Sequence, residues 1–430
     1  MAQRERAPER TTVIEGGTLI HPLRPAVPDG AVVIRGDTIV YAGPMAELDA
    51  AVPPDATKVD ASGGYVVPGW VDIHVHGGGG ADTMDASPEG LRRMTLAHAS
   101  AGTTALLCTT VTASLDQTVE AERAVAEAYR MQRRWWQRAP GSQVTGPGDP
   151  EAWGARIAGI HLEGPYLNPE RKGAQNPAYM RDPDLAELQR MLDASKAADG
   201  EVLLRLVTMA PERAGSEAAI RWLAAHGVQV AVGHSAAEGE VLERAIEAGA
   251  GQVTHLFNGM APFHHRTPGL AGAALADERL VAQLIADGVH VHPVALKVAY
   301  RARGARGIAL ITDALAPMGL GEGRFRLGDF EVVVKDGACR LPDGTLAGSI
   351  LGLGQAVQHM VRWAGATLAD AVAMASWTPA LSVGLGGELG SLRPGARGDV
   401  AVLDAGSLEV RTTIVAGHVV YQREVARASP

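Results

Sequence analysis

The sequence predicts an α/β protein, namely a (β/α)8 TIM-like barrel with a small β-sandwich domain that both chain ends build. Short apolar strands alternate with helices or loops about eight times over roughly 250 residues, which is the usual length of such a barrel. Turn-rich short strands occur near both ends of the chain. No glycine-rich dinucleotide motif follows the first alternating strand, which disfavours an open doubly wound sheet.

The two chain ends carry the pattern of the small domain. Strands are predicted over Thr12–Ile20, Ala31–Val40 and Thr57–Val59, where Pro, Gly and Asp turns separate them. From Leu389 the sequence returns to turns and short strands, as in "GSLRPGARGDVAVLD". We therefore expect residues 1–64 and 386–430 to form the sandwich and residues 65–385 to form the barrel.

The alternating region predicts the barrel strands and their helices in order. The first strand runs from Tyr65 to His74 and His76, and the others are expected at Thr103–Thr110, Arg156–Glu163, Val202–Met209, Val228–His234, Gln252–His255, Leu280–Gly288 and Gly307–Asp313. Helices are expected at Pro88–Ala101, Ser114–Trp136, Pro183–Ala198, Gly215–His226, Ala237–Ala248 and Pro293–Arg303. A β insertion over Phe325–Leu341 and helices over Leu353–Ala364 and Thr367–Ser376 follow.

Composition narrows the class of protein. The net charge is −9, from 39 Lys and Arg against 48 Asp and Glu, and no basic face is evident, so we expect no nucleic-acid or membrane partner. Cys108 and Cys339 are too few for a disulfide framework or a thiolate zinc site. Met1–Arg10 lacks an apolar signal core, which predicts a cytoplasmic protein. In Arg133–Gly154 we favour an exposed helix end and a loop over a stacking platform for nucleic acid.

Metal-binding residue types stand at the ends of five predicted barrel strands. These residues are His74 and His76, Glu163, His234, His255 and Asp313. Side chains at the C-terminal strand ends of such a barrel converge on one site, and residues two apart on a strand face the same side. A single histidine at a strand end is more often a core or rim residue, but chance placement of the whole set is far less common. Imidazole and carboxylate suit Zn²⁺, Fe²⁺ or Mn²⁺.

Two further residues share this region. Asp313 ends the last barrel strand, where a carboxylate can accept a proton from an attacking water and deliver it to a leaving group. The alternative is a helix N-cap, a common role for Asp at a strand–helix junction. His161 shares a strand face with Glu163, so we consider it a support for the metal site.

Ordered motifs carry a family resemblance over essentially the whole chain. The order His-x-His, Glu, His, His, Asp in a barrel beside a split sandwich resembles the amidohydrolase superfamily. Within it, "HLEGPYLNPERKGAQNP", "VGHSAA", "THLFNGMAPFHHRTPGLAGAAL", "ADGVHVHP", "ITDALAPMG" and "LAGS" are similar to the N-acetylglucosamine-6-phosphate deacetylase family. The His-x-His pair alone is a weak signal, whereas the ordered set is specific.

The resemblance implies a role for each matching position. Glu163, His234 and His255 would bind the principal divalent cation, and His74 and His76 would belong to a second or shared position, with one or two ions per subunit. Asp313 would be the general base and acid. The substrate-binding residues would be Ala174, Gln175, Asn258, Gly259, Arg266, His290, Leu346, Ala347 and Gly348. The resemblance also suggests a homodimer.

Two of these residues have physical arguments of their own. An anionic substrate approaching a protein of net charge −9 needs a local cation, and the planar guanidinium of Arg266 matches phosphate oxygens. A rim salt bridge is an equally common role for such an arginine. Gln175 stands where some relatives carry histidine, and its amide N–H₂ is a neutral donor for an oxyanion.

The expected reaction is removal of the acetyl group of N-acetylglucosamine-6-phosphate, which gives glucosamine-6-phosphate and acetate. One alternative is the same reaction on the galactosamine epimer. Another is an amidohydrolase for cyclic amides, disfavoured because Glu163 occupies the slot in which such enzymes carry a bridging lysine. A third is a non-catalytic sugar-phosphate sensor, which would be favoured by missing ligands or a missing Asp313; neither is missing.

Overall fold

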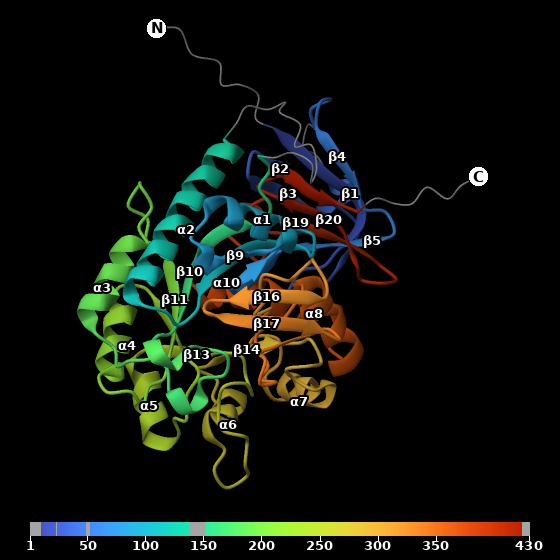
Figure 1. Cartoon of the computed structure of the whole chain (residues 1–430). Helices are drawn as coiled ribbons and strands as arrows, with labels where there is room; N and C mark the ends of the chain where they lie inside the picture. The colour runs from blue at the N-terminus through green and yellow to red at the C-terminus, as the bar shows by residue number, and fades with distance from the viewer. Residues whose placement is uncertain (1–9, 23, 49–51, 138–150, 424–430) are drawn as a thin grey trace.

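A closed parallel barrel forms the larger part of the molecule (Figure 1). The computed structural model describes residues 10–22, 24–48, 52–137 and 151–423. The barrel strands follow one another in the order β6 (Trp70–Val75), β9 (Thr103–Thr110), β10 (Arg156–Glu163), β11 (Leu204–Met209), β12 (Gln229–Val232), β13 (Ala250–Val253), β14 (Val281–Ile285) and β15 (Ile308–Ile311). The N–H of Asp313 donates to the His74 carbonyl at 2.9 Å, which joins the first and last strands. The predicted fold class is confirmed.

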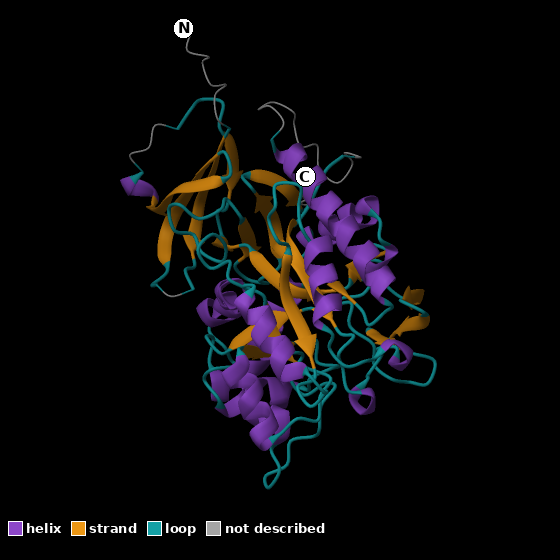
Figure 2. Ribbon diagram, turned by 90° about the vertical axis from the view of Figure 1, so that its left-hand side faces the viewer, coloured by secondary structure: helices purple, strands orange, loops and turns teal. Residues whose placement is uncertain are grey.

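Helices surround this barrel, and Figure 2 shows strands at its centre with helices outside them. They are α1 (Pro88–Ala99), α2 (Leu115–Trp136), α3 (Leu185–Ala194), α4 (Ser216–Ala225), α5 (Gly239–Ala248), α6 (Gly269–Ala276), α7 (Pro293–Arg303), α8 (Leu353–His359), a π-helical turn (Met360–Ala364), α9 (Leu368–Ala375) and α10 (Trp377–Ser382). α6 and α10 are not among the helices predicted from the sequence. Both helices are short, and α10 contains a proline.

Both chain ends join in the small domain. Its strands are β1 (Thr11–Leu19), β2 (Val27–Arg35), β3 (Thr38–Pro44), β4 (Thr57–Asp60), β5 (Gly64–Pro68), β19 (Val400–Asp404), β20 (Val410–Val415) and β21 (His418–Gln422). These strands form one sheet, and Ile14, Val32 and Val402 share one apolar core. The Thr12 hydroxyl then donates to the Gly417 carbonyl at 2.7 Å across the fold.

The strand predicted to start at Tyr65 is in fact two strands in different sheets. β5 pairs with β1 and β19 in the small domain, whereas β6 pairs with β9 in the barrel. The chain changes sheet at Gly69, where a Cβ atom would lie 2.1 Å from the Thr104 side chain. The predicted domain limits stay a prediction, and β5 begins at residue 64, where the first predicted limit falls.

The predicted β insertion is confirmed as three strands, β16 (Gly323–Leu327), β17 (Phe330–Lys335) and β18 (Ala338–Arg340). It packs on the barrel mouth, because Leu327 and Val332 share an apolar cluster with Val111 and Ala347. Most of the Arg133–Gly154 segment lies outside the described residues. In the described part of the chain, no helix is both long and apolar enough to cross a membrane.

Candidate metal centre

The candidate ligands leave the barrel strands at their C-terminal ends. Glu163 is the last residue of β10, and His76 directly follows β6. His234, His255 and Asp313 each lie two residues beyond their strands, with φ angles of 47°, 30° and 50°. A positive φ angle costs a non-glycine residue roughly 1–3 kcal/mol in backbone strain, and such residues cluster at functional sites. The backbone therefore turns sharply at these three positions and directs their side chains into the mouth.

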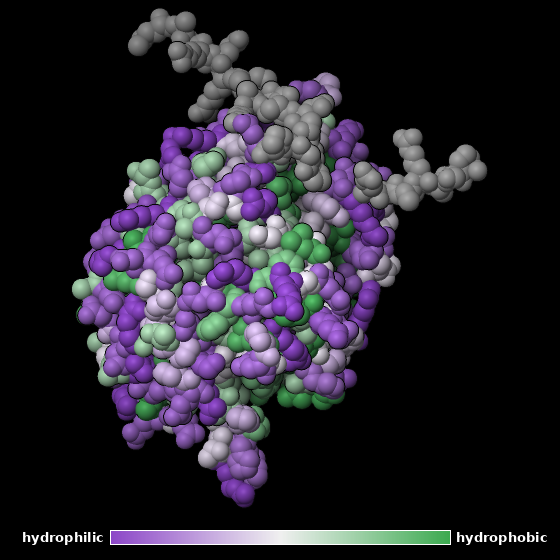
Figure 3. Space-filling view, viewed as in Figure 1, coloured by the Kyte–Doolittle hydropathy of each residue, from purple (hydrophilic) through white to green (hydrophobic). Residues whose placement is uncertain are grey.

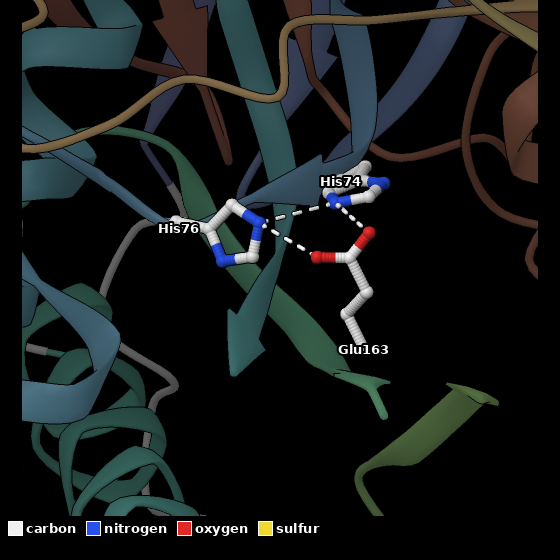
Figure 4. A group of neighbouring side chains, drawn as sticks. All are labelled: His74, His76 and Glu163. Atoms are coloured by element: carbon white, nitrogen blue, oxygen red, sulfur yellow. Dashed lines mark hydrogen bonds and ion pairs between the residues drawn. The ribbon is translucent and has the colours of Figure 1, made fainter. Parts of the chain in front are cut away.

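Glu163 stands at the centre of the cluster. Its Oε1 lies 3.1 Å from His255 Nε2 and 3.2 Å from His234 Nε2. Its Oε2 lies 3.2 Å from His76 Nε2, and Figure 4 shows the rings of His74 and His76 directed at this carboxylate. Two groups of three donors thus share Glu163, one with His234 and His255 and the other with His74 and His76.

The hydrogen bonds of His234 and His255 fit a cation between them. His234 Nδ1 lies 2.8 Å from the Arg171 carbonyl, and His255 Nδ1 lies 3.1 Å from the Asn258 carbonyl. Since a carbonyl only accepts, each Nδ1 carries the hydrogen, and the Nε2 of a neutral ring presents a bare lone pair. The two Nε2 atoms are 3.0 Å apart. Two lone pairs at this distance repel unless a proton or a metal ion lies with them, so the donor set fits a divalent cation.

The electrostatics of the buried site also favour positive charge. Burial lowers the pKa of His76, but hydrogen bonds to Asp313 and Glu163 outweigh it and raise that pKa to about 10. Burial raises the pKa of Glu163, yet the neighbouring His74, His234 and His255 hold it well below its ordinary value. The buried carboxylates therefore stay ionised and attract a cation.

Asp313 lies within reach of the same atoms. Its Oδ1 is 3.2 Å from His76 Nε2 and 3.5 Å from His74 Nε2. Burial raises its pKa, but His74 and His76 more than compensate, so the pKa lies below its ordinary value. No helix starts after it in the described chain between β15 and β16, so Asp313 is not an N-cap.

The side-chain amide of Gln175 is hydrogen-bonded to Glu163 and does not point freely into the barrel mouth. Its Nε2 donates to Glu163 Oε2 at 2.5 Å, while its Oε1 accepts from the Thr112 backbone N–H at 2.7 Å. Gln175 and Ala174 line a cavity of about 270 Å³ together with the turn between β16 and β17. The amide expected to stabilise an oxyanion instead orients the shared carboxylate in this structure.

Gly259 is tightly confined between two of the ligands. Its φ is +60°, and a Cβ atom there would lie 3.0 Å from His234 Nδ1 and 3.2 Å from His255 Cε1. Asn258 accepts from His255 through its carbonyl. This pair, predicted to bind substrate, thus also supports the ligand rings.

The remaining predicted substrate residues come from three further segments of the chain. His290 pairs with Asp287 at 2.7 Å, and although burial lowers the pKa of His290, Asp287 raises it above its ordinary value. Gly348, beside Leu346 and Ala347, packs so closely that a Cβ atom would lie 2.7 Å from the Asp313 carbonyl. Arg266 is exposed on the loop before α6, which projects from the molecule at the lower edge of Figures 1 and 3.

Sequence reasoning missed several residues around the ligands. Gln283 Oε1 lies 3.4 Å from His74 Nδ1, and Gln252 contacts Gln283 in turn. Both are buried polar residues in short apolar strands, and this pattern could have indicated them. His161, considered as a support, packs its ring edge-on against His74 at 4.6 Å between centroids and bonds Thr208 at 2.8 Å.

Comparison with known proteins identifies the family. Residues 65–420 match the pattern of the amidohydrolase family. The chain belongs to the amidohydrolase family. Members of this family typically depend on a metal, and the described Glu and His clusters can hold one.

Several relatives of this amidohydrolase are named as deacetylases of phosphorylated amino sugars. It is 41% identical to N-acetylgalactosamine-6-phosphate deacetylase of Escherichia coli O157:H7, over 83% of this chain and 87% of that protein. It is 35% identical to N-acetylglucosamine-6-phosphate deacetylase of Bacillus subtilis (strain 168), over 92% and 95%. A mutant N-acetyl-D-glucosamine-6-phosphate deacetylase of Mycobacterium smegmatis, solved in complex with N-acetyl-D-glucosamine-6-phosphate, superposes with a TM-score of 0.82. Its sequence identity is 35%, covering 96% of this chain and 100% of that one.

Proposed function

We propose that this protein hydrolyses the acetamide of N-acetylglucosamine-6-phosphate, which yields glucosamine-6-phosphate and acetate. The observation that carries the proposal is the convergence of Glu163, His234, His255 and Asp313 within hydrogen-bond distance of shared neighbours at the barrel mouth. The relatives named above act, by their names, on phosphorylated amino sugars.

The metal ligands follow from the two donor groups. We assign the principal divalent cation to Glu163, His234 and His255, and a second or shared position to His74, His76 and Glu163. The imidazole and carboxylate donors suit Zn, Fe or Mn. Such a cation supplies Lewis-acid polarisation of the acetyl carbonyl and lowers the pKa of water.

Asp313 moves the proton in this proposal. As a buried carboxylate held ionised by His74 and His76, it can take a proton from the attacking water. The same oxygen then delivers that proton to the departing amine of the sugar. Gln175 keeps Glu163 in position through its amide N–H, and its own carbonyl is fixed by Thr112.

The sugar phosphate would lie between the predicted substrate-binding residues. We assign the phosphate to Arg266 with Asn258 and Gly259, and the sugar to His290, Ala174 and the backbone of Leu346–Gly348. The Arg266 loop extends away from its own barrel, which supports a homodimer in which Arg266 reaches the neighbouring site. Phe263 on the same loop is 55% exposed, as expected of a residue that a second subunit covers.

The galactosamine epimer is the second candidate substrate, favoured by the 41% identity to the Escherichia coli enzyme named for it. Steady-state acetate release distinguishes the two candidate substrates. It is measured on both phosphorylated epimers and on N-acetylglucosamine without phosphate. We expect the highest kcat/KM for N-acetylglucosamine-6-phosphate. Faster turnover of the galactosamine epimer would favour the second candidate, and no acetate from either phosphate would overturn the proposal.

An Arg266→Ala variant tests the phosphate contact directly. Its KM for the phosphorylated sugar should rise about tenfold or more, since a charged hydrogen bond contributes roughly 1.5–3 kcal/mol. Turnover of the unphosphorylated sugar should not change. Equal losses on both sugars would remove Arg266 from the phosphate site.

A further inference from the structure

A chain of side-chain amides connects His74 to the backbone of a helix outside the barrel. His74 Nδ1 lies 3.4 Å from Gln283 Oε1 on β14. Gln283 Nε2 donates to Gln252 Oε1 on β13 at 3.1 Å, and Gln252 Nε2 donates to the Ser382 carbonyl on α10 at 2.9 Å. His74 and Gln283 are fully buried and Gln252 is 2% exposed, so water does not compete for these bonds.

The last member of the chain fixes its direction. The Ser382 carbonyl can only accept, so Gln252 must turn its N–H₂ toward α10 and its oxygen toward Gln283. Gln283 must then donate to Gln252, which leaves its own oxygen facing His74. An oxygen acceptor opposite Nδ1 requires a hydrogen on that nitrogen. Reversal of either amide would bring two oxygens or two N–H₂ groups face to face in the barrel interior.

We infer that Gln283 and Gln252 are positioning residues that hold His74 with its hydrogen on Nδ1, so that Nε2 is the atom available to a metal ion. The inference rests on the proposed metal site and concerns its second position, formed by His74, His76 and Glu163. Contacts of this kind commonly change metal affinity by about 10–100-fold when they are lost.

His76 lacks such a support. Its Nδ1 is buried without a hydrogen-bond partner among the described residues, whereas its Nε2 lies 3.2 Å from that of His74. Of the two histidines, His74 alone has its ring hydrogen placed by a fixed acceptor. The amide chain therefore makes occupancy of the second metal position depend on residues from β13, β14 and α10.

The first test observes the ring itself. Metal-free protein labelled with ¹⁵N-histidine would report which ring nitrogen of His74 carries hydrogen, the signal being assigned by its loss in His74→Asn. We expect a hydrogen on Nδ1 in the wild type and the appearance of bare Nδ1 in Gln283→Leu and Gln252→Leu. Unchanged ring signals in both variants would overturn the inference.

The second test measures metal binding by equilibrium dialysis against Zn²⁺. Gln283→Leu and Gln252→Leu should lose affinity at one position about 10–100-fold. The matched control is Gln132→Leu, which removes a buried amide bonded to Ala155 and Ile157 away from the site. Equal losses in this control would overturn the inference.

The two proposals fail differently. If wild-type protein bound none of Zn²⁺, Fe²⁺ and Mn²⁺, the proposed function would fail, while the ¹⁵N spectra of the metal-free protein would still decide the hydrogen position on His74. If Zn²⁺ bound normally to both leucine variants, the positioning role would be wrong and the metal site would stand.

Discussion

At the scale of single residues, the site depends on backbone conformations that a sequence pattern does not reveal. His234, His255 and Asp313 were expected as strand ends, but each lies two residues further on, in a left-handed turn. The residue types at strand ends were sufficient to indicate the ligands, because convergence at a barrel mouth follows from topology. The roles of Gln175, Gln252 and Gln283 were not predictable, since they depend on which way a buried amide faces.

Asp313→Asn tests the proposed proton transfer. The amide keeps the size of the carboxyl group but cannot accept a proton, so acetate release should fall about 10²–10⁴-fold. Metal content, measured on the same preparation, should stay at the wild-type level because Asp313 is outside both donor groups. Retained activity would exclude Asp313 as the proton carrier.

Gly259→Ala tests the packing of the ligand rings. A methyl group there would lie 3.0 Å from His234 Nδ1, and the alanine backbone would have to keep a positive φ angle. Metal affinity should fall about tenfold or more, because the ring must shift. Gly251→Ala is the control, since a Cβ atom there has no neighbour within 4 Å. Wild-type affinity in Gly259→Ala would contradict the described geometry.

Glu122 on α2 gives a prediction about pH and stability. Both its carboxylate oxygens are buried without a partner among the described residues, and burial raises its pKa well above the ordinary value. Because the pKa of this acid is higher in the folded state than in the unfolded state, its protonated form favours folding at low pH, and its ionised form opposes folding at neutral and higher pH. Folded stability is lost as pH rises from the unfolded pKa near 4.3 toward the folded pKa, by up to about 1.4 kcal/mol per pH unit.

Glu122→Gln removes this penalty. Thermal unfolding followed between pH 4.5 and 8 should show a variant whose advantage over the wild type grows as pH rises. Glu120→Gln is the control, because Glu120 is exposed on the same helix. A constant difference between Glu122→Gln and the wild type across this range would show that Glu122 is not a buried acid.

At the scale of elements, periodicity identified most helices and the barrel strands. α7 matches its predicted limits, and the β insertion forms the strands β16, β17 and β18. α6 was missed because its glycines weaken a helical pattern that is apolar on all sides. The division of the first predicted strand into β5 and β6 depends on pairing with β19, which is distant in the sequence. Such pairing is invisible to a local window.

A partly buried ion pair connects two such distant elements. Arg156 at the start of β10 lies 3.2 Å from Asp399 before β19, and Asp399 also accepts from the Ala416 N–H at 2.7 Å. Asp399→Ala leaves a partly buried guanidinium without this partner and the Ala416 N–H without its acceptor, which should destabilise the fold by about 1–3 kcal/mol. In the control Glu331→Ala, which removes an exposed pair with Arg324, the loss should be about 0–1 kcal/mol. Chemical denaturation measures both, and similar losses would contradict this assignment.

At the scale of the whole molecule, eight strands bring together residues from His74 to Asp313 at one end of a barrel. The small domain, made from both chain ends, packs beside the barrel (Figure 2). The Arg156–Asp399 pair is one of the contacts between them. Fold class and family were predictable because they depend on the order of elements and motifs. The domain limits, the number of bound ions and the homodimer remain predictions.

The most direct measurement is acetate release from N-acetylglucosamine-6-phosphate by one preparation before chelation, after chelation and after a divalent cation is restored. The account predicts loss of activity on chelation and its return with Zn²⁺, Fe²⁺ or Mn²⁺. It also predicts no return in a Glu163→Gln variant, in which the carboxylate shared by both donor groups is gone. Undiminished acetate release by the metal-free protein would contradict it.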